Sequence, residues 1–482
     1  MAEGRQHHNL TLAILTIAGT AYALQQTLVV PALPTLQHDL HTTTTWVTWV
    51  LTVFLLVSSV ATPILGKLGD QYGKERLLVI ALAVFLVGSA GSIFAWNVWS
   101  LIGARALAGA GGAVFPLSFA IVRDEFPREK MSVAIGVISA MFGVGGGLGI
   151  VFSGVIVDHA SWRWLFVAGA IPIALAIVLV HRFVPESPIK TASKVDVVGA
   201  MLLSLGLVAL LLALTEGETW GWGSARILGL FATSALALAA WVAAELRVAQ
   251  PLVDMHVFVR REVLFTNVTT LIAGFAMFGT FVLLPNFVET PRGLGSLARL
   301  VHYGFGASAT KAGLYLLPTS ATMLFAAPLA GVIARRTGSR WTLSAGMVLV
   351  ALSCGSLALW HARPWEILAA MPSFGVGAGF AFAAMATLIT ESVRPTETGI
   401  ATGMNTVMRT VGGVIGGQVG AALLSAYLIG GTHVPAATGF QIAFATCAVA
   451  ALVGAATAAL VTPPRAVRRG RLAPAAAESG DG

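Results

Sequence analysis

GKLGDQYGKER, residues 66–76, is a short charged turn between two long apolar segments. Two helices that are joined by so short a turn need glycine where their backbones approach closely or where φ becomes positive. A carboxylate such as Asp70 can accept charge-assisted hydrogen bonds from nearby cations or lie against the N-terminus of a neighbouring helix. The stretch therefore predicts two helices joined by a turn that can act as a latch.

The composition explains why this turn is flanked by apolar sequence. The chain has 482 residues, of which 56% are hydrophobic and 10% are charged, whereas a typical soluble domain is about 25% charged. A soluble protein of this length needs a polar surface. A lipid bilayer removes that need, because each helix that crosses it takes about 20 apolar residues. We therefore predict an all-α polytopic membrane protein.

Other classes of protein lack support in the sequence. The formal net charge is +8, but the basic residues fall in short turns and are not interleaved with aromatics along one face, so we expect no nucleic-acid partner. Cys354 and Cys447 lie in apolar runs and read as small hydrophobic residues, without the spacing of a disulfide framework or a metal site. Walker A, HExxH and hydrolase-triad patterns are absent, so we expect no enzyme activity and no cofactor.

Hydropathy over windows of about 19 residues predicts fourteen membrane-spanning helices. They lie near 10–32, 43–65, 77–96, 99–121, 132–157, 164–184, 195–215, 228–248, 263–288, 309–333, 341–361, 365–390, 398–429 and 439–461. An even number of spans puts both termini on the same side. Most of the 29 lysines and arginines fall in the segments on that side, including 66–76, so the positive-inside rule places both termini and this turn in the cytoplasm.

The sequence also contains a repeat. AIGVISAMFGVGGGLG at 134–149 matches ATGMNTVMRTVGGVIG at 401–416 at an offset of 267, and Gly66 and Gly73 match Gly331 and Gly338 at an offset of 265. Two copies in the same orientation predict two bundles related by an axis along the membrane normal. The predicted division is a six-helix bundle over 1–190, two inserted helices with their loops over 191–262, a second six-helix bundle over 263–462, and a disordered cytoplasmic tail over 463–482.

The order Gly66-x-x-x-Asp70-x-x-Gly73-Lys74-x-Arg76 resembles the signature loop of the major facilitator superfamily. The number of predicted spans is similar to that of its fourteen-helix drug:proton antiporter branch. The resemblance implies the major facilitator fold, two six-helix bundles with two inserted helices, and a loop that holds the state closed towards the cytoplasm. The alternative is an ordinary positive-inside loop with turn glycines.

Two further motifs extend the resemblance. Arg105-x-x-x-Gly109 is similar to the family's second motif, although Ala108 stands in place of its usual glutamine. The glycine-rich segment 143–154 resembles the antiporter motif, with Ile150 in place of its usual proline. Small residues let helices slide closely past each other, so packing and switching are equally good interpretations. The glycines that we assign to this motif are Gly143, Gly145, Gly149 and Gly154.

Two arginines lie within predicted spans, where an arginine costs roughly 2.5–3.5 kcal/mol on insertion scales. For Arg105 the resemblance implies contact with a substrate anion or coupling to proton binding, and the alternative is a clamp on backbone carbonyls. For Arg409 we slightly favour a structural role. The related drug antiporters usually carry an aspartate where this chain has Gln25, which cannot titrate. We therefore expect proton coupling at Glu289 or Asp158, or weak coupling.

The resemblance also implies a central cavity lined by the first, fourth, ninth and twelfth helices. Because Arg105 lacks a paired carboxylate, we expect that cavity to favour neutral, zwitterionic or anionic amphiphiles over lipophilic cations. Packing or lipid exposure is the alternative for each residue. The candidate lining residues are Tyr22, Gln25, Gln26, Arg105, Asn267, Met277, Phe278 and Phe281.

Together these patterns predict a secondary active transporter that exports small amphiphilic compounds, in drug or metabolite efflux and antibiotic resistance, by alternating access in exchange for protons. Its expected partners are a small-molecule substrate, protons and membrane lipids, and we expect a monomer. The abundance of arginine over lysine suggests a bacterial source and hence the plasma (inner) membrane. A nutrient importer of the same superfamily, or a lipid or metabolite exporter with weak proton coupling, are the alternatives.

Overall fold

The computed structural model describes residues 8–187, 196–290, 292, 303–429 and 434–462, so the predicted tail 463–482 lies outside the described residues. Within these ranges the chain is helical, apart from one isolated bridge between Leu428 and Pro435. The helices are α1 (His8–Thr27), α2 (Leu33–Asp39), α3 (Thr44–Tyr72), α4 (Lys74–Ile93), α5 (Val98–Ala108), η1 (Gly109–Ala113), α6 (Val114–Glu125), α7 (Arg128–His159), α8 (Arg163–Phe183), α9 (Val197–Trp220), α10 (Ala225–Glu245), α11 (Met255–Phe258), α12 (Arg261–Glu289), α13 (Ala309–Thr337), α14 (Ser339–Leu359), α15 (Pro364–Ser392), η3 (Pro395–Glu397), α16 (Thr398–Ala426) and α17 (Ala437–Ala459).

Thirteen helical spans in the described ranges are long and apolar enough to cross a membrane. Each of the fourteen predicted ranges overlaps an observed helix, and α5, η1 and α6 together form the single span predicted near 99–121. The remaining range corresponds to α1, which is not among the thirteen because Gln25, Gln26 and several threonines dilute its apolar sequence. The fold is thus an all-helical membrane fold, and the count of fourteen is not confirmed.

Short polar residues and glycines set the ends of several helices. The side chains of Thr43, Asn97 and Ser308 accept hydrogen bonds from backbone amides in the first turns of α3, α5 and α13, which satisfies donors that a helix N-terminus leaves free. Gly73 ends α3 with φ of 121° and Gly338 ends α13 with φ of 96°. Only glycine adopts such angles without strain, so these two positions force the sharp turns predicted there.

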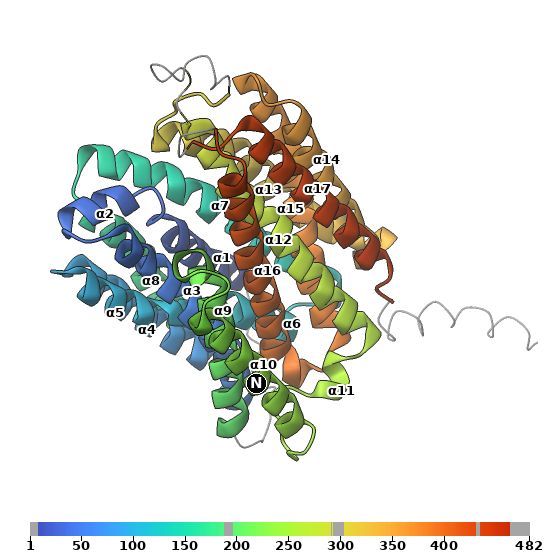
Figure 1. Cartoon of the computed structure of the whole chain (residues 1–482). Coiled ribbons are helices and arrows are strands. Elements are labelled where there is room, and N and C mark those ends of the chain that lie inside the picture. The colour runs from blue at the N-terminus through green and yellow to red at the C-terminus, as the bar shows by residue number, and fades with distance from the viewer. Residues whose placement is uncertain (1–7, 188–195, 291, 293–302, 430–433, 463–482) are drawn as a thin grey trace, which may run out of the picture.

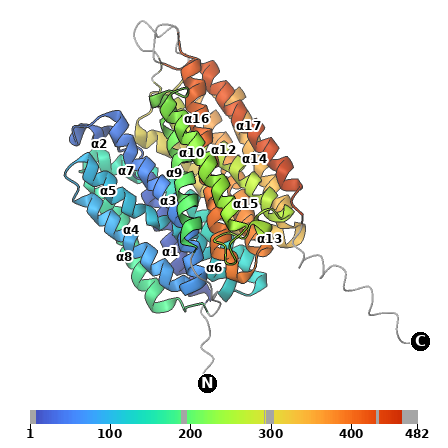
Figure 2. The same cartoon turned by 60° about the horizontal axis from the view of Figure 1, so that its bottom comes forward.

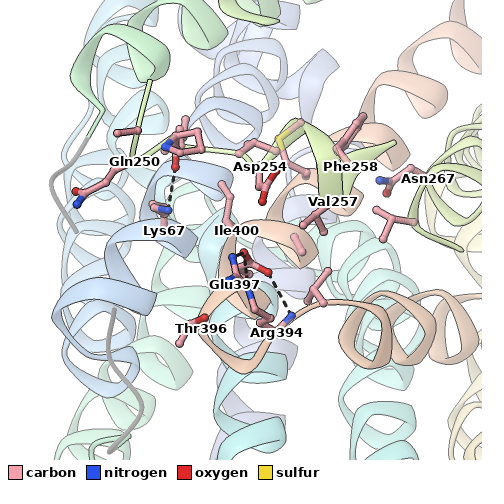
Figure 3. Close-up of a pocket in the computed structure, with 18 residues that line it drawn as sticks. Lys67, Gln250, Asp254, Val257, Phe258, Asn267, Arg394, Thr396, Glu397 and Ile400 are labelled. Carbon is pink, nitrogen blue, oxygen red and sulfur yellow. Dashed lines mark hydrogen bonds and ion pairs between the residues drawn. The ribbon is translucent and has the colours of Figure 1, made fainter. Parts of the chain in front are cut away.

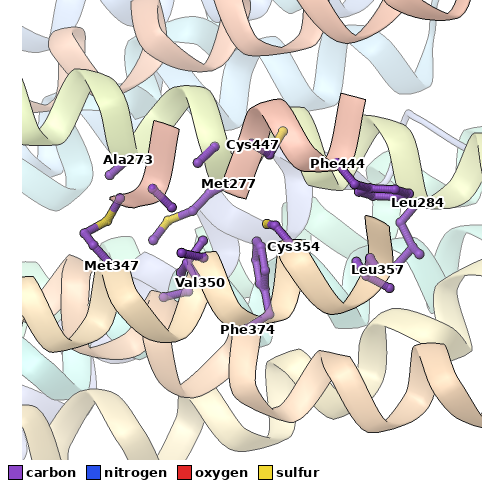
Figure 4. Packing of buried hydrophobic residues seen from close by; sticks show 14 of the residues in the cluster. Ala273, Met277, Leu284, Met347, Val350, Cys354, Leu357, Phe374, Phe444 and Cys447 are labelled. Carbon is purple, nitrogen blue, oxygen red and sulfur yellow. The ribbon is translucent and has the colours of Figure 1, made fainter. Parts of the chain in front are cut away.

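Helices α1–α8 and α12–α17 form two groups, which we call the first and second bundles (Figure 1). The first bundle buries a cluster that includes Phe85, Phe115 and Val122. The second buries a separate cluster in which Met277, Phe374 and Phe444 pack together (Figure 4). The free cysteines, Cys354 and Cys447, lie in this second core as small apolar residues.

The inserted helices α9 and α10 pack against each other, and α9 also contacts α3 and α16. They therefore lie along the line where the two bundles meet (Figures 1 and 2). Leu203 and Leu207 of α9 share an apolar cluster with Ile400 and Met404 of α16. Helices α9 and α10 thus pack against one side of the interface between the bundles and are not part of either core; we call them the buttress.

The two bundles meet along two interfaces that follow the sequence repeat. In α3, Gly66 lies against the backbone oxygen of Gly399 in α16, and in α13, Gly331 lies against the backbone oxygen of Ser132 in α7. Gly66 and Gly331 are 265 residues apart, and Ser132 and Gly399 are 267 apart, which are the two offsets of the repeat. The contacts between Gly403 and Pro63 and between Gly136 and Pro328 form a second equivalent pair.

The close approach at Gly66 yields a first testable prediction. A methyl group there would collide with the backbone oxygen of Gly399, so Gly66→Ala should separate the bundles at this end. Double electron–electron resonance between two spin labels measures that separation. The labels are attached to cysteines introduced at Tyr72 and Thr337, two exposed and repeat-related positions. We expect the label distance to shift to longer values in Gly66→Ala.

The matched control is Gly103→Ala, because a methyl group at Gly103 meets nothing within 4 Å. In a helix this change usually stabilises by about 0.5–1 kcal/mol, so the control should keep the native label distance. An identical distance in both variants would contradict the steric role of Gly66.

Candidate functional site

A buried carboxylate joins the two bundles at one end of the molecule, which we call the Asp70 end. Asp70 is fully buried, and its two carboxylate oxygens accept hydrogen bonds from the backbone amides of Gly399 and Ile400, each at 3.2 Å. These amides lie in the first turn of α16. A helix N-terminus carries a partial positive charge, so it stabilises a carboxylate there. The residue that the sequence singles out therefore bonds to the other bundle.

Lys74 completes this contact from the start of α4. Its side chain is fully buried and its ammonium group donates to Asp124, lies 3.8 Å from an Asp70 carboxylate oxygen and donates to the backbone oxygen of Pro395 at 3.4 Å. The Ser187 hydroxyl donates to the same Asp124 oxygen at 2.5 Å. One buried cation thus lies between two carboxylates and reaches the second bundle.

Arg123 strengthens the same contact, although the motif does not include it. Its guanidinium donates to the backbone oxygen of Val393 at 2.5 Å, to the Thr398 hydroxyl at 2.8 Å and to the backbone oxygen of Arg394 at 3.2 Å. In the sequence it is one of several basic residues in the loop after the fourth span, with nothing to distinguish it. We call Asp70, Lys74 and Arg123, with the segment 393–400 that they bind, the clasp.

Gly73 and Arg76, two further residues of the motif, shape the turn between α3 and α4. The Glu186 carboxylate accepts from the backbone amides of Glu75 at 3.3 Å and Arg76 at 3.4 Å, and the Arg76 guanidinium lies 3.6 Å from it. This contact stays within the first bundle, and the Arg76 side chain is 70% exposed. Among the motif residues, Gly66, Asp70 and Lys74 therefore contact the second bundle.

A cavity of about 350 Å³ lies beside the clasp, and residues of both bundles line it (Figure 3). Asn267 and Ile400 come from the second bundle, Lys67 from α3, and Asp254 from the connection between α10 and α12. The Lys67 ammonium donates to the backbone oxygen of Pro251 at 3.1 Å. The connection after the inserted helices is thus tied to the first bundle at this end. Nearby, the hydrogen bond and charge of Glu397 raise the pKa of Arg394.

Deeper in the molecule, an unbroken row of four aromatic rings joins two arginines. The nearest ring centroids within it are 3.6–5.9 Å apart, and each guanidinium lies 4.1 Å from the ring next to it. A desolvated cation on an aromatic face gains about 2 kcal/mol, which offsets part of the cost of a charge at this depth. In order, the row consists of Arg105, Phe54, Tyr22, Phe115, Phe142 and Arg409.

The two arginines differ in their surroundings. Arg105 is fully buried inside the first bundle, where its Nε donates to the backbone oxygen of Val50 at 3.4 Å and both Nη atoms lack a hydrogen-bond partner among the described residues. Arg409 is half-buried between the bundles, with its guanidinium over Phe142 of the first bundle and 5.0 Å from the Phe382 ring of the second.

Arg409 faces a small cavity between the bundles. The sequence had slightly favoured a structural role for this arginine. The sequence repeat contained a signal that Arg409 lies between the bundles. Phe142 and Arg409 occupy equivalent positions of the repeat, and repeat-related positions on α7 and α16 face the same axis. The cavity is lined by Phe119, Ser139, Phe142, Phe382, Met385, Ala386, Thr402, Asn405, Thr406 and Arg409. Ser139 and Thr406 are a second repeat-related pair.

Tyr22 and Asn267, two predicted lining residues, lie next to this region. The Tyr22 hydroxyl shares a hydrogen bond with the Ser58 hydroxyl at 2.9 Å. Asn405, which lines the small cavity, donates through its Nδ2 to the Asn267 side-chain oxygen at 2.9 Å and to the Thr270 hydroxyl at 2.8 Å. This amide pair thus joins a residue that lines the small cavity to one that lines the larger cavity at the Asp70 end.

The other predicted lining residues lie elsewhere. Gln25 is buried inside the first bundle, where its amide donates to the Ser89 hydroxyl at 3.3 Å, and Gln26 is half-buried. Met277 is fully buried in the second core (Figure 4). Phe278 and Phe281 are half-buried neighbours on α12, with ring centroids 6.3 Å apart.

The two carboxylates predicted for proton coupling lie at the end of the molecule opposite the clasp. Asp158, near the end of α7, accepts a hydrogen bond at 3.1 Å from the Thr310 hydroxyl of α13, so it bridges the bundles. Glu289 is exposed at the end of α12.

The glycine-rich segment of α7 lies between two partners. Gly143 and Gly154 face Met323 and Thr310 of α13, whereas Gly145 and Gly149 face α1. The segment therefore touches the other bundle on one side and its own bundle on the other.

Two helical bundles that meet around a buried clasp, with an arginine between them, define a polytopic membrane protein of the transporter type. The family model of the Major Facilitator Superfamily matches residues 15–417, and again 268–479. The chain belongs to this superfamily, whose members are transporters and not enzymes.

Named relatives agree with this assignment. The chain is 32% identical over 356 residues to Multidrug resistance protein 3 of Bacillus subtilis, which covers 72% of this chain and 66% of that protein. It is 28% identical over 407 residues to the Multidrug transporter protein MdtP of the same organism, with coverage of 83% and 72%. The chain thus spans about two thirds of the length of the first relative.

The fold is similar to that of a solved structure, the human organic anion transporter MFSD10 (TETRAN). The TM-score is 0.65 at 15% sequence identity, and the match covers 94% of this chain and 99% of that one. At this identity the likeness establishes the fold alone.

Proposed function

We propose that the protein exports small amphiphilic compounds by alternating access in exchange for protons, as a member of the fourteen-helix drug:proton antiporter branch. In this proposal α1 is the fourteenth span. The bundles over 1–190 and 263–462 rock against each other, with the inserted helices over 191–262 as a buttress. The Asp70 end faces the cytoplasm, both termini are cytoplasmic, and the protein acts as a monomer in the bacterial inner membrane.

The clasp is the observation that carries the proposal. Asp70, Lys74 and Arg123 bind backbone and side-chain groups of the other bundle through buried, charge-assisted bonds. These bonds exist only in one relative position of the bundles, so they stabilise a state that is closed at this end. Glycine contacts such as Gly66 with Gly399 allow the close approach that this state needs.

The direction of transport is supported by the relatives, two of which are named as a multidrug resistance protein and a multidrug transporter. For proton exchange the chain lacks a carboxylate at Gln25, whose amide instead bonds inside the first bundle. We assign coupling to Asp158 and Glu289. Asp158 is the better placed of the two, because its carboxylate accepts a hydrogen bond from the other bundle and protonation would weaken that bond.

Proteoliposomes with an imposed pH gradient test the proposal. Purified protein is reconstituted, and a panel of neutral, anionic and cationic amphiphiles is scored for movement in both directions. Export requires substrate and proton fluxes in opposite directions, with loss of movement when the gradient is collapsed. Accumulation in right-side-out vesicles driven by inward proton flow would instead identify an importer, and lipid movement without a pH dependence would identify a weakly coupled lipid exporter.

Arg105 gives a prediction that separates function from structure. It is a buried cation that has no carboxylate partner and two unbonded Nη atoms among the described residues, and burying a charge without a partner is costly. We expect Arg105→Met to keep or raise the melting temperature while lowering transport roughly tenfold, the effect of about 1.4 kcal/mol. If cations of the ethidium type are the best substrates and Arg105→Met transports them normally, the role that the resemblance implies for Arg105, contact with a substrate anion or coupling to proton binding, is wrong.

A further inference from the structure

Arg409 carries a positive charge that nothing in the described structure neutralises. Its guanidinium lies over the rings of Phe142 and Phe382, and no hydrogen bond or ion pair joins its side-chain nitrogens to a described residue. It differs from Arg105 in being half-buried and in lining a cavity between the bundles. An arginine at membrane depth that meets neither an acidic side chain nor a carbonyl is a functional-site candidate.

A second observation points into the same cavity. Ser139 is 1% exposed and lines the cavity, and its hydroxyl oxygen has no hydrogen-bond partner in the part of the chain that the structure describes. A buried hydroxyl without a partner is costly and calls for an explanation. It lies on α7, one turn before Phe142, whose ring is under the Arg409 guanidinium. An unsatisfied hydroxyl and an unsatisfied cation therefore share one cavity.

Of the other eight lining residues, five are apolar, and Thr402, Asn405 and Thr406 are polar. Phe119, Phe142 and Phe382 line the cavity with Met385 and Ala386, and the described lining set contains no acidic side chain. The cavity holds only about 10 Å³, which is room for one water-sized group. A whole substrate therefore needs the bundles to move apart, whereas a small polar group fits in the present state.

We propose that Arg409 and Ser139 bind the acidic group of organic anions, and that the substrates are monoanionic carboxylates with an apolar ring. This inference rests on the proposed transport function and names its substrate class. The planar guanidinium can donate two parallel hydrogen bonds to a carboxylate, and the Ser139 hydroxyl supplies a third donor. The ring of the ligand then packs against Phe119, Phe142 and Phe382.

Direct binding tests the proposal without relying on transport. Tritiated 2-naphthoate and its neutral isostere 2-naphthamide are measured by equilibrium dialysis against the purified full chain in detergent. We expect the wild type to bind the carboxylate at least about tenfold more tightly than the amide, which corresponds to about 1.4 kcal/mol. Arg409→Gln should abolish this preference, Arg409→Lys should retain part of it, and Ser139→Ala should weaken naphthoate binding a few-fold.

The matched control is Arg335→Gln, since Arg335 is an exposed arginine on α13 outside the cavity, and this variant should keep the wild-type preference. Melting temperatures verify that each variant is folded, and Arg409→Lys keeps the charge if Arg409→Gln fails to fold. A wild type without preference for the carboxylate, or an Arg409→Gln protein with wild-type preference, would overturn the proposal. Binding with the expected preference but without pH-driven movement in proteoliposomes would instead count against the proposed function alone.

Discussion

Replacing Asp70 by asparagine should lower the transport rate roughly hundredfold. Two backbone amides of α16 donate to the Asp70 carboxylate, and Lys74 lies 3.8 Å away. A hydrogen bond to a charged group contributes about 1.5–3 kcal/mol, so loss of the charge removes about 3 kcal/mol from the closed state. Since each 1.4 kcal/mol is a factor of about ten, the population of that state falls by about two orders of magnitude relative to the open one.

Transport in proteoliposomes and the label pair at positions 72 and 337 measure this effect together. The distance distribution should shift to longer values in Asp70→Asn as transport falls. Asp39→Asn is the matched control, because the Asp39 side chain is 45% exposed and its ion pair is with the neighbouring His38. Normal transport with an unchanged distance in Asp70→Asn would show that the clasp does not hold the closed state.

Replacing Lys74 by methionine should destabilise the fold by about 3–5 kcal/mol, the usual cost of removing one member of a buried charge group. The Lys74 and Asp124 side chains are both fully buried, and Asp70 beside them is buried too. Without the ammonium group two carboxylates face each other with no cation between them. Thermal unfolding of the purified protein should show a large drop in melting temperature, and the Lys74→Met/Asp124→Asn double variant should recover much of it.

Lys67→Met provides the comparison. The Lys67 ammonium donates to the backbone oxygen of Pro251 and has no carboxylate partner among the described residues, so its loss should cost about 1–3 kcal/mol at most. Equal melting temperatures for the Lys67 and Lys74 variants would contradict the assignment of Lys74 as the central charge of the clasp.

Features that depend on residues close together in the sequence could be predicted from the sequence. The helices lie where long apolar runs predict them, because the length of a span and the absence of charge are local properties. Gly73 and Gly338 end their helices with positive φ, as the glycine pattern indicates. The repeat offsets also hold in space, since they relate the contact of Gly66 with Gly399 to the contact of Gly331 with Ser132. The polar α1 marks the limit, because the sequence windows predict a span there, whereas α1 is not among the thirteen described spans that are long and apolar enough to cross a membrane.

The clasp partners and the orientation of the two arginines inside membrane-spanning helices were decided by the tertiary structure. Asp70 bonds to Gly399, 329 residues away, and no local pattern names such a partner. Hydropathy could not separate Arg105 inside one bundle from Arg409 between the bundles, because lipid-facing and protein-facing sides of a membrane helix are both apolar. Which side faces a cavity depends on the neighbouring helices, and their packing is set by contacts between segments hundreds of residues apart.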